Sequence, residues 1–451
     1  MGWNNYLNEN RLKTTSRIKE NDDRNEFESD FGRIIFSPAI RRMHDKTQVF
    51  PLTTDDNIHS RLTHSLEVMS VGESIALNVL KNSQFKEVIQ SYKNIGDVYR
   101  VIPVIVKNAC LVHDIGNPPF GHFGETVIKE YFSKFFKTDT NKSRFKLDDL
   151  QKQDFEKFDG NGQGFRVLTK LQMLDDKYGL NLTFGTLGAY LKYPNPDQLE
   201  PEILSLKKRG VFQSERDYYE KVMNALSLMN GSKPIRHPLS FIMEAADSIC
   251  YLIMDIEDGF NKKWYGYEDI KKELKDVSNM NDVFIRIEHN HRGSGIAKIV
   301  NLRLSLIKRL VLLSVSNYVT NIKKICLGDY NCELIDDDNS GLVKKLKCFC
   351  DINILQKKEI ISLELTGHSV LKGLLDYYIE FCFDNSDKYR NRALRMISKS
   401  VLDISLLENN KETFDDMDDY YKIRVIVDYI TGMTDQYALN QFQRLSGQKI
   451  N

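Results

Sequence analysis

One short segment, Leu111–Glu125 (LVHDIGNPPFGHFGE), restricts what this chain can fold into and do more than any other. It ends an apolar run with the adjacent pair His113 and Asp114, and it places His122 three residues before Glu125, beyond a turn rich in glycine and proline. Such a turn stops a helix, so the pair stands at the end of a helix that the apolar run predicts to be buried. Because unpaired buried charge is costly, the pair needs either a metal ion or an ordinary salt bridge.

The composition of the 451-residue chain is typical of a globular protein with a large core, because 41% of its residues are hydrophobic and 28% are charged. The length allows about two or three ordinary domains, or one large helical domain with additions. Sixty-three basic residues balance sixty-three acidic ones. Net charge therefore indicates nothing about partners, and any phosphate or nucleic-acid site must be local.

The seven cysteines are odd in number and contain no CxxC pair, which favours free thiols in a reducing compartment over a disulfide framework. The N-terminal residues MGWNNYLNENRLK lack the apolar stretch of a signal peptide. No uninterrupted apolar run approaches the roughly 18 residues that a membrane span needs. We therefore expect a cytoplasmic protein that has no membrane partner.

Helical periodicity dominates the sequence, and there is little strand signal, so the fold class is expected to be all-α. The segments with the clearest helical pattern are 60–80, 101–112, 238–259 and 301–327. Two polar stretches interrupt this pattern. Residues 137–163 are interpreted as a mobile excursion that ends in a glycine-rich turn around Asn161, and residues 329–341 as an acidic loop.

The segment 238–259 carries a stripe of acidic residues on an otherwise apolar helix. Four carboxylates and one tyrosine follow each other at spacings of three, four, four and three, as Glu244, Asp247, Tyr251, Asp255 and Asp258. These spacings place all five on one helix face. A solvent-facing stripe is the simpler reading, but the neighbouring positions are apolar. The stripe is therefore predicted to be buried, and a buried acidic stripe indicates a metal site or a substrate cavity.

His64, His113, Asp114 and Asp247 together form a plausible ligand set on three predicted helices. Two imidazoles and two carboxylates suit Mg, Mn, Fe, Co or Ni, and the absence of a thiolate disfavours a structural zinc site. Taken alone, a histidine on an amphipathic helix such as His64 is usually structural. In a helix that starts near residue 120, His122 and the carboxylate three residues later share a face, as a proton-transfer pair requires.

Several quoted segments resemble, in the same order, the deoxyguanosine triphosphate triphosphohydrolase (dGTPase) family of the HD phosphohydrolase superfamily. They are RLTHSLEV, LVHDIGNPPFGHFGE, GNGQGFR, TLGAYLKYP, GVFQSE, EAADSICYLIMDIEDG and DYITGMTDQYAL. The resemblance spans roughly residues 33–439. It implies an HD-type catalytic core with an N-terminal extension over residues 1–260. It also implies a mainly helical C-terminal region over residues 261–451 that packs on the core and contributes to the substrate site and to oligomerisation.

The resemblance further implies a reaction, the metal-dependent hydrolysis of a deoxynucleoside triphosphate, with dGTP expected, to the deoxynucleoside and inorganic triphosphate. Metal ligands would be His64, His113, Asp114 and Asp247, holding Mg or Mn, with Co, Ni or Fe as alternatives. His122 would be the catalytic acid/base, oriented by Glu125. No short motif decides which base is preferred, because base selection depends on the shape of the pocket.

Substrate contacts are also implied by matching motifs. Gln48 and Val49 would meet the sugar and base, Tyr251 would pack against the deoxyribose, and Asp255 would accept from the 3′-hydroxyl. The expected triphosphate contacts are Asn161, Arg166, Lys192, Tyr193 and Lys208, with Arg424 as a C-terminal basic contact.

The expected partners are a dNTP substrate, a second dNTP or single-stranded DNA as effector, and further copies of the chain in a homo-oligomer, for which a hexamer is favoured. Two other readings stay open from the sequence. One is another HD-superfamily nucleotide phosphohydrolase, and the other is a non-catalytic nucleotide or nucleic-acid sensor.

Overall fold

A computed structural model describes residues 2–449 apart from 15–21, 54–57, 91, 93, 173–175, 198 and 291–294. Nearly all regular structure in these ranges is helical, and their only paired strands are the short antiparallel ribbon of β1 (Met229–Asn230) and β2 (Lys233–Pro234). The expected all-α fold class is confirmed.

The expected metal and catalytic residues lie in the chain up to residue 261, either on a helix or directly after one. The label η marks a short 3-10 or π helix. The elements up to residue 261 are α1 (Trp3–Tyr6), α2 (Glu26–Ile35), α3 (Pro38–Arg42), η1 (Met43–Asp45), α4 (Arg61–Lys81), α5 (Ser83–Ile89), η2 (Ile95–Asp97), α6 (Val98–Val112), α7 (Gly121–Phe135), α8 (Asp139–Arg144), α9 (Asp149–Glu156), α10 (Gly160–Arg166), η3 (Val167–Leu171), α11 (Phe184–Tyr190), η4 (Gln213–Glu215), α12 (Arg216–Leu226) and α13 (Pro238–Asn261). Beyond it follow α14 (Tyr267–Leu274), α15 (Met280–Asn290), α16 (Gly295–Leu327), α17 (Leu342–Cys350), η5 (Asp351–Leu355), α18 (Lys358–Cys382), α19 (Asp387–Met396), α20 (Lys399–Asn409), α21 (Asp419–Thr431) and α22 (Asp435–Leu445).

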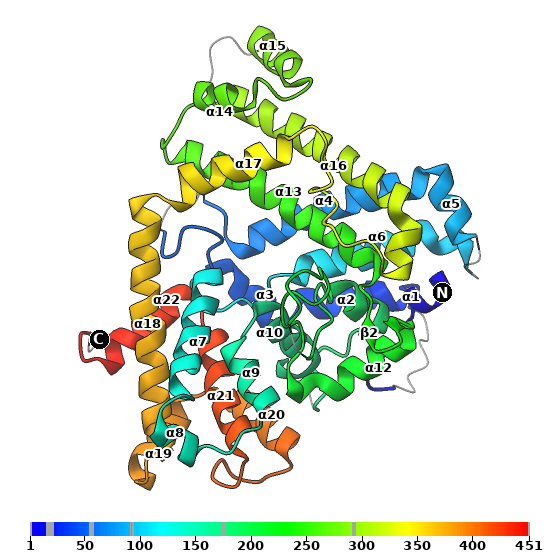
Figure 1. Ribbon diagram of the computed structural model, residues 1–451. Helices are drawn as coiled ribbons and strands as arrows, with labels where there is room; N and C mark the ends of the chain where they lie inside the picture. The colour runs from blue at the N-terminus through cyan, green and yellow to red at the C-terminus, as the bar shows by residue number, and fades with distance from the viewer. Residues whose placement is uncertain are drawn as a thin grey trace.

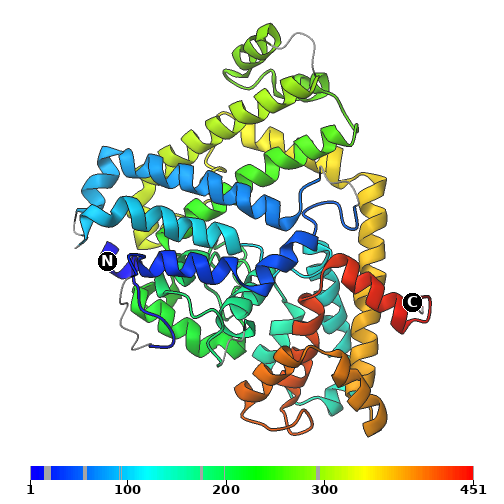
Figure 2. The same cartoon turned by 180° about the vertical axis from the view of Figure 1, so that it is seen from behind.

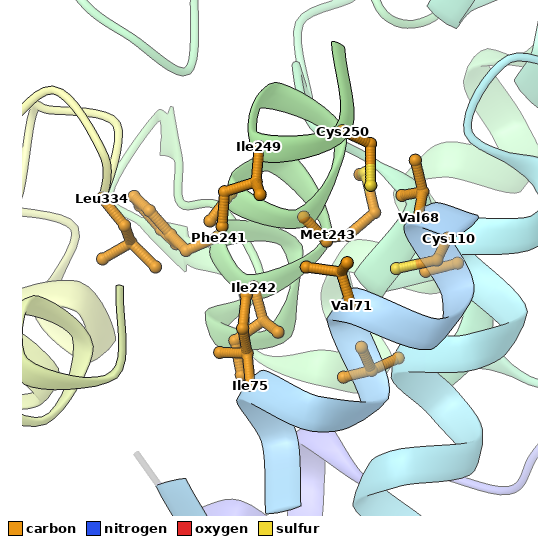
Figure 3. Close-up of a cluster of buried hydrophobic side chains, with 14 of the residues drawn as sticks. Val68, Val71, Ile75, Cys110, Phe241, Ile242, Met243, Ile249, Cys250 and Leu334 are labelled. Carbon is orange, nitrogen blue, oxygen red and sulfur yellow. The ribbon is translucent and has the colours of Figure 1, made fainter. Parts of the chain in front are cut away.

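Helices α4, α6 and α13 form the centre of the fold (Figure 1). α4 and α6 approach so closely that a Cβ on Gly72 would lie 2.6 Å from the Sγ of Cys110. Figure 3 shows the apolar side chains that fill the space between α4 and α13, among them Val68, Val71, Ile75, Ile242, Met243 and Cys250. Because the same three helices carry the expected metal ligands, this packing fixes where those ligands lie.

The N-terminus of α13 is closed by a buried histidine. The Nδ1 atom of His237 accepts from the backbone N–H of Leu239 at 3.1 Å, and its Nε2 atom donates to the carbonyl of Tyr6 at 3.0 Å. The residue is 1% exposed. Burial lowers the pKa of His237 to about 4, because the charged ring would lose its hydration.

We expect the free energy of unfolding to fall by about 3 kcal/mol in total as the pH drops from about 6.5 to about 4. The reason is that His237 binds a proton in the unfolded state over this range but stays neutral in the folded state. Below pH 4 this loss is complete. Urea unfolding between pH 7 and pH 4 measures it. His237→Asn should flatten the slope, whereas His44→Asn, at a side chain that is 73% exposed, should leave it unchanged. Equal slopes in all three proteins would contradict the assignment.

A second hydrophobic cluster joins residues 120–158 to residues 370–438, which are far apart in the sequence. Helices α7 and α9 pack against α18 and α21, and the rings of Phe132, Phe155 and Tyr420 follow one another with centroids 5.0 and 5.6 Å apart. Figure 1 shows α18 running along one edge of the molecule beside α7, and Figure 2 shows the C-terminal helices from behind. The division expected at residue 260 stays a prediction, and this cluster draws residues from both sides of it.

Residues 137–163 are not the mobile excursion that the sequence suggested, because they form α8, α9 and the start of α10. Asn161 lies in α10 rather than in a turn. The glycines of α10 serve close approach: a Cβ on Gly164 would lie 2.0 Å from the Oη of Tyr190, and a Cβ on Gly160 would lie 2.1 Å from the Oδ1 of Asn117. A glycine-rich stretch without an apolar stripe reads as a turn, although here it brings a helix against its neighbours.

The acidic segment 329–341 contains no long helix, as expected, but it is firmly attached to the core. Leu334 and Ile335 are both 0% exposed, and Figure 3 shows Leu334 beside Phe241 of α13. The carboxylate of Glu333 pairs with Lys207 at 3.1 Å. The segment therefore lies over the start of α13 rather than in solvent.

Two other expectations concern the whole chain. All seven cysteines are free thiols. Among the helices in the described ranges, none is sufficiently long and apolar to cross a membrane.

Candidate active site

The structure brings His64, His113, Asp114 and Asp247 together from three separate helices. The Oδ1 atom of Asp247 lies 3.2 Å from the Nε2 of His64 and 3.4 Å from the Nε2 of His113. The Oδ1 atom of Asp114 lies 3.6 Å from the same His113 nitrogen. Ligand atoms of the two histidines and Asp114 all lie within 4.8 Å of one another. One ion could therefore contact the two histidines and Asp114, and Asp247 lies beside both histidines.

The chemistry of this group fits a divalent cation. The Nδ1 atom of His113 donates to the carbonyl of Cys110 at 2.7 Å, which directs Nε2 toward the carboxylates. That Nε2 atom is buried and has no hydrogen-bond partner among the described residues. Burial opposes protonation of the ring, but Asp114 and Asp247 outweigh it and raise the pKa of His113 to about 9. A cation at this point would replace the proton as the partner of both carboxylates.

Arg61 and Asn117 hold Asp114 in place. The guanidinium of Arg61 forms an ion pair with Asp114, and the side-chain amide of Asn117 donates to its Oδ1 atom at 2.7 Å. Burial alone would raise the pKa of Asp114, but Arg61 outweighs this and holds it well below its usual range. The sequence analysis missed both residues. A usable signal for Arg61 was its place one helical turn before His64.

His122 and Glu125 form the expected pair on the first turns of α7. The Nδ1 atom of His122 lies 3.5 Å from the Oε2 of Glu125, whose other oxygen accepts from the backbone N–H of Gly160 at 2.8 Å. The Glu125 side chain is 3% exposed and that of His122 is 71% exposed. The hydrogen bond with Glu125 raises the pKa of His122, and burial of Glu125 is outweighed by His122, so the pKa of Glu125 falls to about 2. The pair therefore consists of a histidine that favours its protonated form and a buried carboxylate that fixes its orientation.

A cavity of about 290 Å³ joins the metal ligands to the expected substrate contacts. Its lining residues are Gln48, Arg61, His113, Asp114, Asn117, His122, Asn161, Lys192, Tyr193, Lys208, Asp247, Ser248 and Tyr251. The ammonium of Lys192 lies 3.4 Å from Asp247, and that of Lys208 lies 3.7 Å from Asp159. The cavity thus combines carboxylates that can hold a cation with ammonium groups that can bind phosphate oxygens, so it suits a polyanion bound through a cation.

Two of the expected sugar contacts lie beside this cavity rather than in its lining. Val49 is half-buried next to Gln48, and Asp255 is 2% exposed one turn beyond Tyr251 on α13. The Oδ2 atom of Asp255 is buried without a hydrogen-bond partner among the described residues. Burial, reinforced by the nearby Asp258, raises the pKa of Asp255 well above its usual range. Glu244, Asp255 and Asp258 of the acidic stripe are thus buried, as the sequence predicted, whereas Asp247 and Tyr251 are half-buried where they line the cavity.

The structure does not bring Arg166 to the cavity. It is 0% exposed, and its guanidinium binds Asp428 at 2.7 Å, Glu215 at 2.6 Å and Glu408 at 2.8 Å. All three of its nitrogens are therefore already bound to carboxylates. The expected contact with a triphosphate has no support in this geometry, because the carboxylates occupy the fork that a phosphate would need.

Arg424 likewise lies away from the cavity. It is 0% exposed, donates to the Oε1 of Gln163 at 2.8 Å and lies over the ring of Phe212, 3.9 Å from its centroid. Its place in the structure is a packing position inside the second hydrophobic cluster.

Family comparisons agree with this geometry. Residues 61–159 match the HD domain, which begins at Arg61 and includes the first three metal-type ligands and the His122 pair. Residues 337–444 match the phosphohydrolase-associated domain. The fold and the site thus define a hydrolase with an HD domain.

Relatives that align over nearly their full length narrow the family to which the chain is assigned. A deoxyguanosinetriphosphate triphosphohydrolase-like protein of Listeria monocytogenes is 35% identical over 474 residues, covering 99% of this chain and 100% of that protein. A protein of the same name from Synechocystis is 32% identical, covering 99% of each chain. The deoxyguanosinetriphosphate triphosphohydrolase of Enterobacter sp. (strain 638) is 32% identical, covering 93% of each chain. The chain belongs to the deoxyguanosinetriphosphate triphosphohydrolase family.

Proposed function

We propose that the protein hydrolyses deoxynucleoside triphosphates, dGTP foremost, to the deoxynucleoside and inorganic triphosphate. The observation that carries this proposal is the single cavity lined by His113, Asp114 and Asp247, by His122 and by two lysines. His64 lies directly behind this lining, within ligand distance of His113 and Asp114, and Glu125 lies behind His122. The names of the relatives point to the same substrate and product. One water molecule is consumed, and the bond between the α-phosphorus and the 5′-oxygen is broken.

His64, His113, Asp114 and Asp247 would hold the divalent ion, Mg or Mn, with Co, Ni or Fe as alternatives. When bound there, such an ion lowers the pKa of water and polarises a phosphoryl oxygen. Arg61 and Asn117 would hold Asp114 in place for the ion.

His122 would donate a proton to the departing 5′-oxygen. Its Nδ1 atom faces Glu125, so the Nε2 atom is the nitrogen that remains for the substrate. Glu125 favours the protonated ring and fixes its orientation, as a general acid requires.

The remaining lining residues would bind the substrate. Lys192 and Lys208, with Asn161 and Tyr193, would contact the triphosphate, since ammonium groups form charge-assisted hydrogen bonds with phosphate oxygens. Tyr251 would pack against the deoxyribose and exclude a 2′-hydroxyl. This ring lines the cavity one turn along α13 from Asp247, so it stands beside the metal-type cluster.

Further sugar and base contacts are proposed for three residues. Asp255 would accept from the 3′-hydroxyl, and Gln48 and Val49 would contact the sugar and base. A homo-oligomer, with a hexamer favoured, and an effector that is a dNTP or single-stranded DNA remain part of this proposal.

Product analysis tests the proposal. The purified protein is incubated with each of the four dNTPs, and with GTP, in Mn²⁺ or Mg²⁺, and the phosphate products are separated by ion-exchange chromatography. We expect inorganic triphosphate from dNTPs, none from GTP, and none after chelation of the metal. Release of orthophosphate or pyrophosphate would contradict the proposed bond cleavage and favour another HD-superfamily phosphohydrolase. Binding of dNTP without any product would favour a sensor.

A further inference from the structure

The C-terminal motif DYITGMTDQYAL resembles the family but has no role in the site described so far. Its second aspartate, Asp435, is the first residue of α22 and is 2% exposed. The carboxylate is not needed to cap its own helix, because the side chain of Thr434 accepts from the backbone N–H of Tyr437. An acidic residue at the start of a helix is also stabilised by the helix dipole. The dipole does not require the carboxylate to be buried or to accept from particular donors.

One oxygen of Asp435 binds the turn that leads into the catalytic helix. Its Oδ1 atom accepts from the backbone N–H of Phe120 at 2.9 Å. Phe120 has the left-handed backbone angles φ 62° and ψ 18°, and Gly121 follows with φ 58°. A bulky residue stays in this region only where its surroundings enforce it. The next residue after these two is His122.

The ring of Phe120 has a second restraint that Asp435 does not supply. It lies against α18, where a Cβ on Gly367 would come within 2.7 Å of the ring. Packing therefore holds the side chain of Phe120, while Asp435 holds its backbone N–H. The hydrogen bond between Asp435 and the backbone N–H of Phe120 can therefore be removed without creating a cavity in the core.

The other oxygen of Asp435 binds the segment that carries Gln48. Its Oδ2 atom accepts from the backbone N–H of Thr47 at 3.0 Å and from the Thr47 hydroxyl at 2.5 Å. Thr47 pairs with Ser60 in an isolated antiparallel bridge, and Ser60 caps the helix that carries His64. Gln48 itself lines the cavity.

A lysine makes a parallel connection between the same parts of the molecule. The buried ammonium of Lys46 donates to the carbonyl of Asn117 at 2.6 Å and to the carbonyl of Thr431 at 2.8 Å. The side chains of Asp435 and Lys46 therefore connect the end of α21 and the start of α22 to the catalytic turn and to residues 46–47.

We propose that Asp435 is a positioning residue, which holds the catalytic acid through Phe120 and the sugar-contacting segment through Thr47. This rests on the proposed function for the roles of His122 and Gln48. A carboxylate suits the task because its two oxygens accept from three donors that lie on two different segments. An asparagine offers one acceptor oxygen, so its amide group would face an N–H donor on one side or the other.

Two variants separate the two contacts. Asp435→Asn is expected to lower kcat and raise KM for dGTP, with kcat falling about 10- to 100-fold, because a displacement of about 1 Å in a reacting group has effects of this size. Thr47→Val removes the hydroxyl donor but keeps the backbone one. It is expected to raise KM about three- to tenfold with kcat within about twofold of the wild-type value, since one of the three hydrogen bonds to the Asp435 carboxylate is lost while the backbone N–H of Thr47 still binds it. Affinity for Mn²⁺, measured by calorimetry, should be unchanged in both.

Gln436→Ala is the matched control. Gln436 is the exposed neighbour on the same helix turn, and its side chain bonds only to Asn440 among the described residues. This variant should keep kcat and KM. Asp435→Asn with wild-type kcat and KM would overturn the proposal, as would a loss of activity no larger than the loss of folded protein measured by circular dichroism. Where Asp435→Asn does not fold, Thr47→Val decides, and an unchanged KM there overturns the proposal.

A measurement without substrate keeps this proposal distinct from the proposed function. Amide hydrogen exchange of the peptide that covers residues 114–125 should be faster in Asp435→Asn than in Gln436→Ala, because asparagine offers the Phe120 amide either its NH₂ group or a neutral oxygen that accepts more weakly than a carboxylate. Equal exchange in the two proteins would overturn the positioning role. A wild-type protein that releases no triphosphate from any dNTP would instead count against the proposed function alone.

Discussion

His122→Ala is expected to lower kcat by about 10²- to 10⁴-fold, the usual range for a general acid, while leaving Mn²⁺ affinity and dNTP binding close to the wild-type values. Binding and catalysis should separate because the ion-pair partner of His122 is Glu125, which is not one of the four metal-type ligands. Triphosphate release measures kcat, and calorimetry measures Mn²⁺ binding. Glu130→Gln, on the exposed face of the same helix, is the control and should behave as wild type. Turnover that survives in His122→Ala would show that another group carries the proton.

The pH profile gives an independent check on this pair. Because the hydrogen bond with Glu125 raises the pKa of His122, the acid form persists to higher pH than it would for a free histidine. The rate should therefore begin to fall only above the usual histidine range. In Glu125→Gln the supporting negative charge is gone, so the alkaline limb should move to lower pH. An unmoved limb would indicate that it reports a different group.

Arg166→Met is expected to reduce the free energy of unfolding by about 3–5 kcal/mol, the cost of removing the central cation from a buried ion-pair network. Lys170 stays beside Glu215 and Glu408, and Arg424 stays beside Asp428. Asp428, Glu215 and Glu408 all lose their shared partner in this variant. Urea unfolding at neutral pH measures the effect. Arg216→Met is the matched control, because that arginine pairs with Asp197 at a partly exposed site, where an ion pair contributes about 1 kcal/mol or less.

The same variant decides between the structural and the substrate-binding interpretation of Arg166. A structural arginine predicts that the folded fraction of Arg166→Met keeps its KM for dNTP. A triphosphate contact predicts a raised KM with little loss of stability, and that result would contradict the network that the structure shows.

The sequence predicted those parts of the site that local pattern can specify. Helical periodicity placed His64 and Asp247 on two buried helices, and a carboxylate three residues after His122 could be recognised as its neighbour on a helix that starts at residue 121. The convergence of the four metal-type ligands followed from chemistry, because buried imidazoles and carboxylates need a common partner.

Arg166 and Arg424 show that a local pattern does not reveal which partner a side chain binds. A buried arginine that binds protein carboxylates and an exposed one that binds phosphate need the same residue type, and the partners of Arg166 lie up to 262 residues away. Arg61 was missed although it lies one helical turn before His64, because its partner Asp114 is 53 residues away in the sequence. The glycines of α10 resembled a turn because close packing and turning both require a residue without a side chain.

The cluster that joins α7 and α9 to α18 and α21 also has a consequence for synthesis on the ribosome. The helix that carries His122 leaves the exit tunnel long before residues 358–431, against which it packs, have been made. Until then, apolar side chains such as Phe132 have no partner from those helices, and a nascent chain in that state exposes an apolar surface that chaperones bind. Catalytic competence should therefore arise late and all at once, when α21 and α22 emerge, so truncated or stalled chains would carry every metal ligand and still be unable to consume nucleotides.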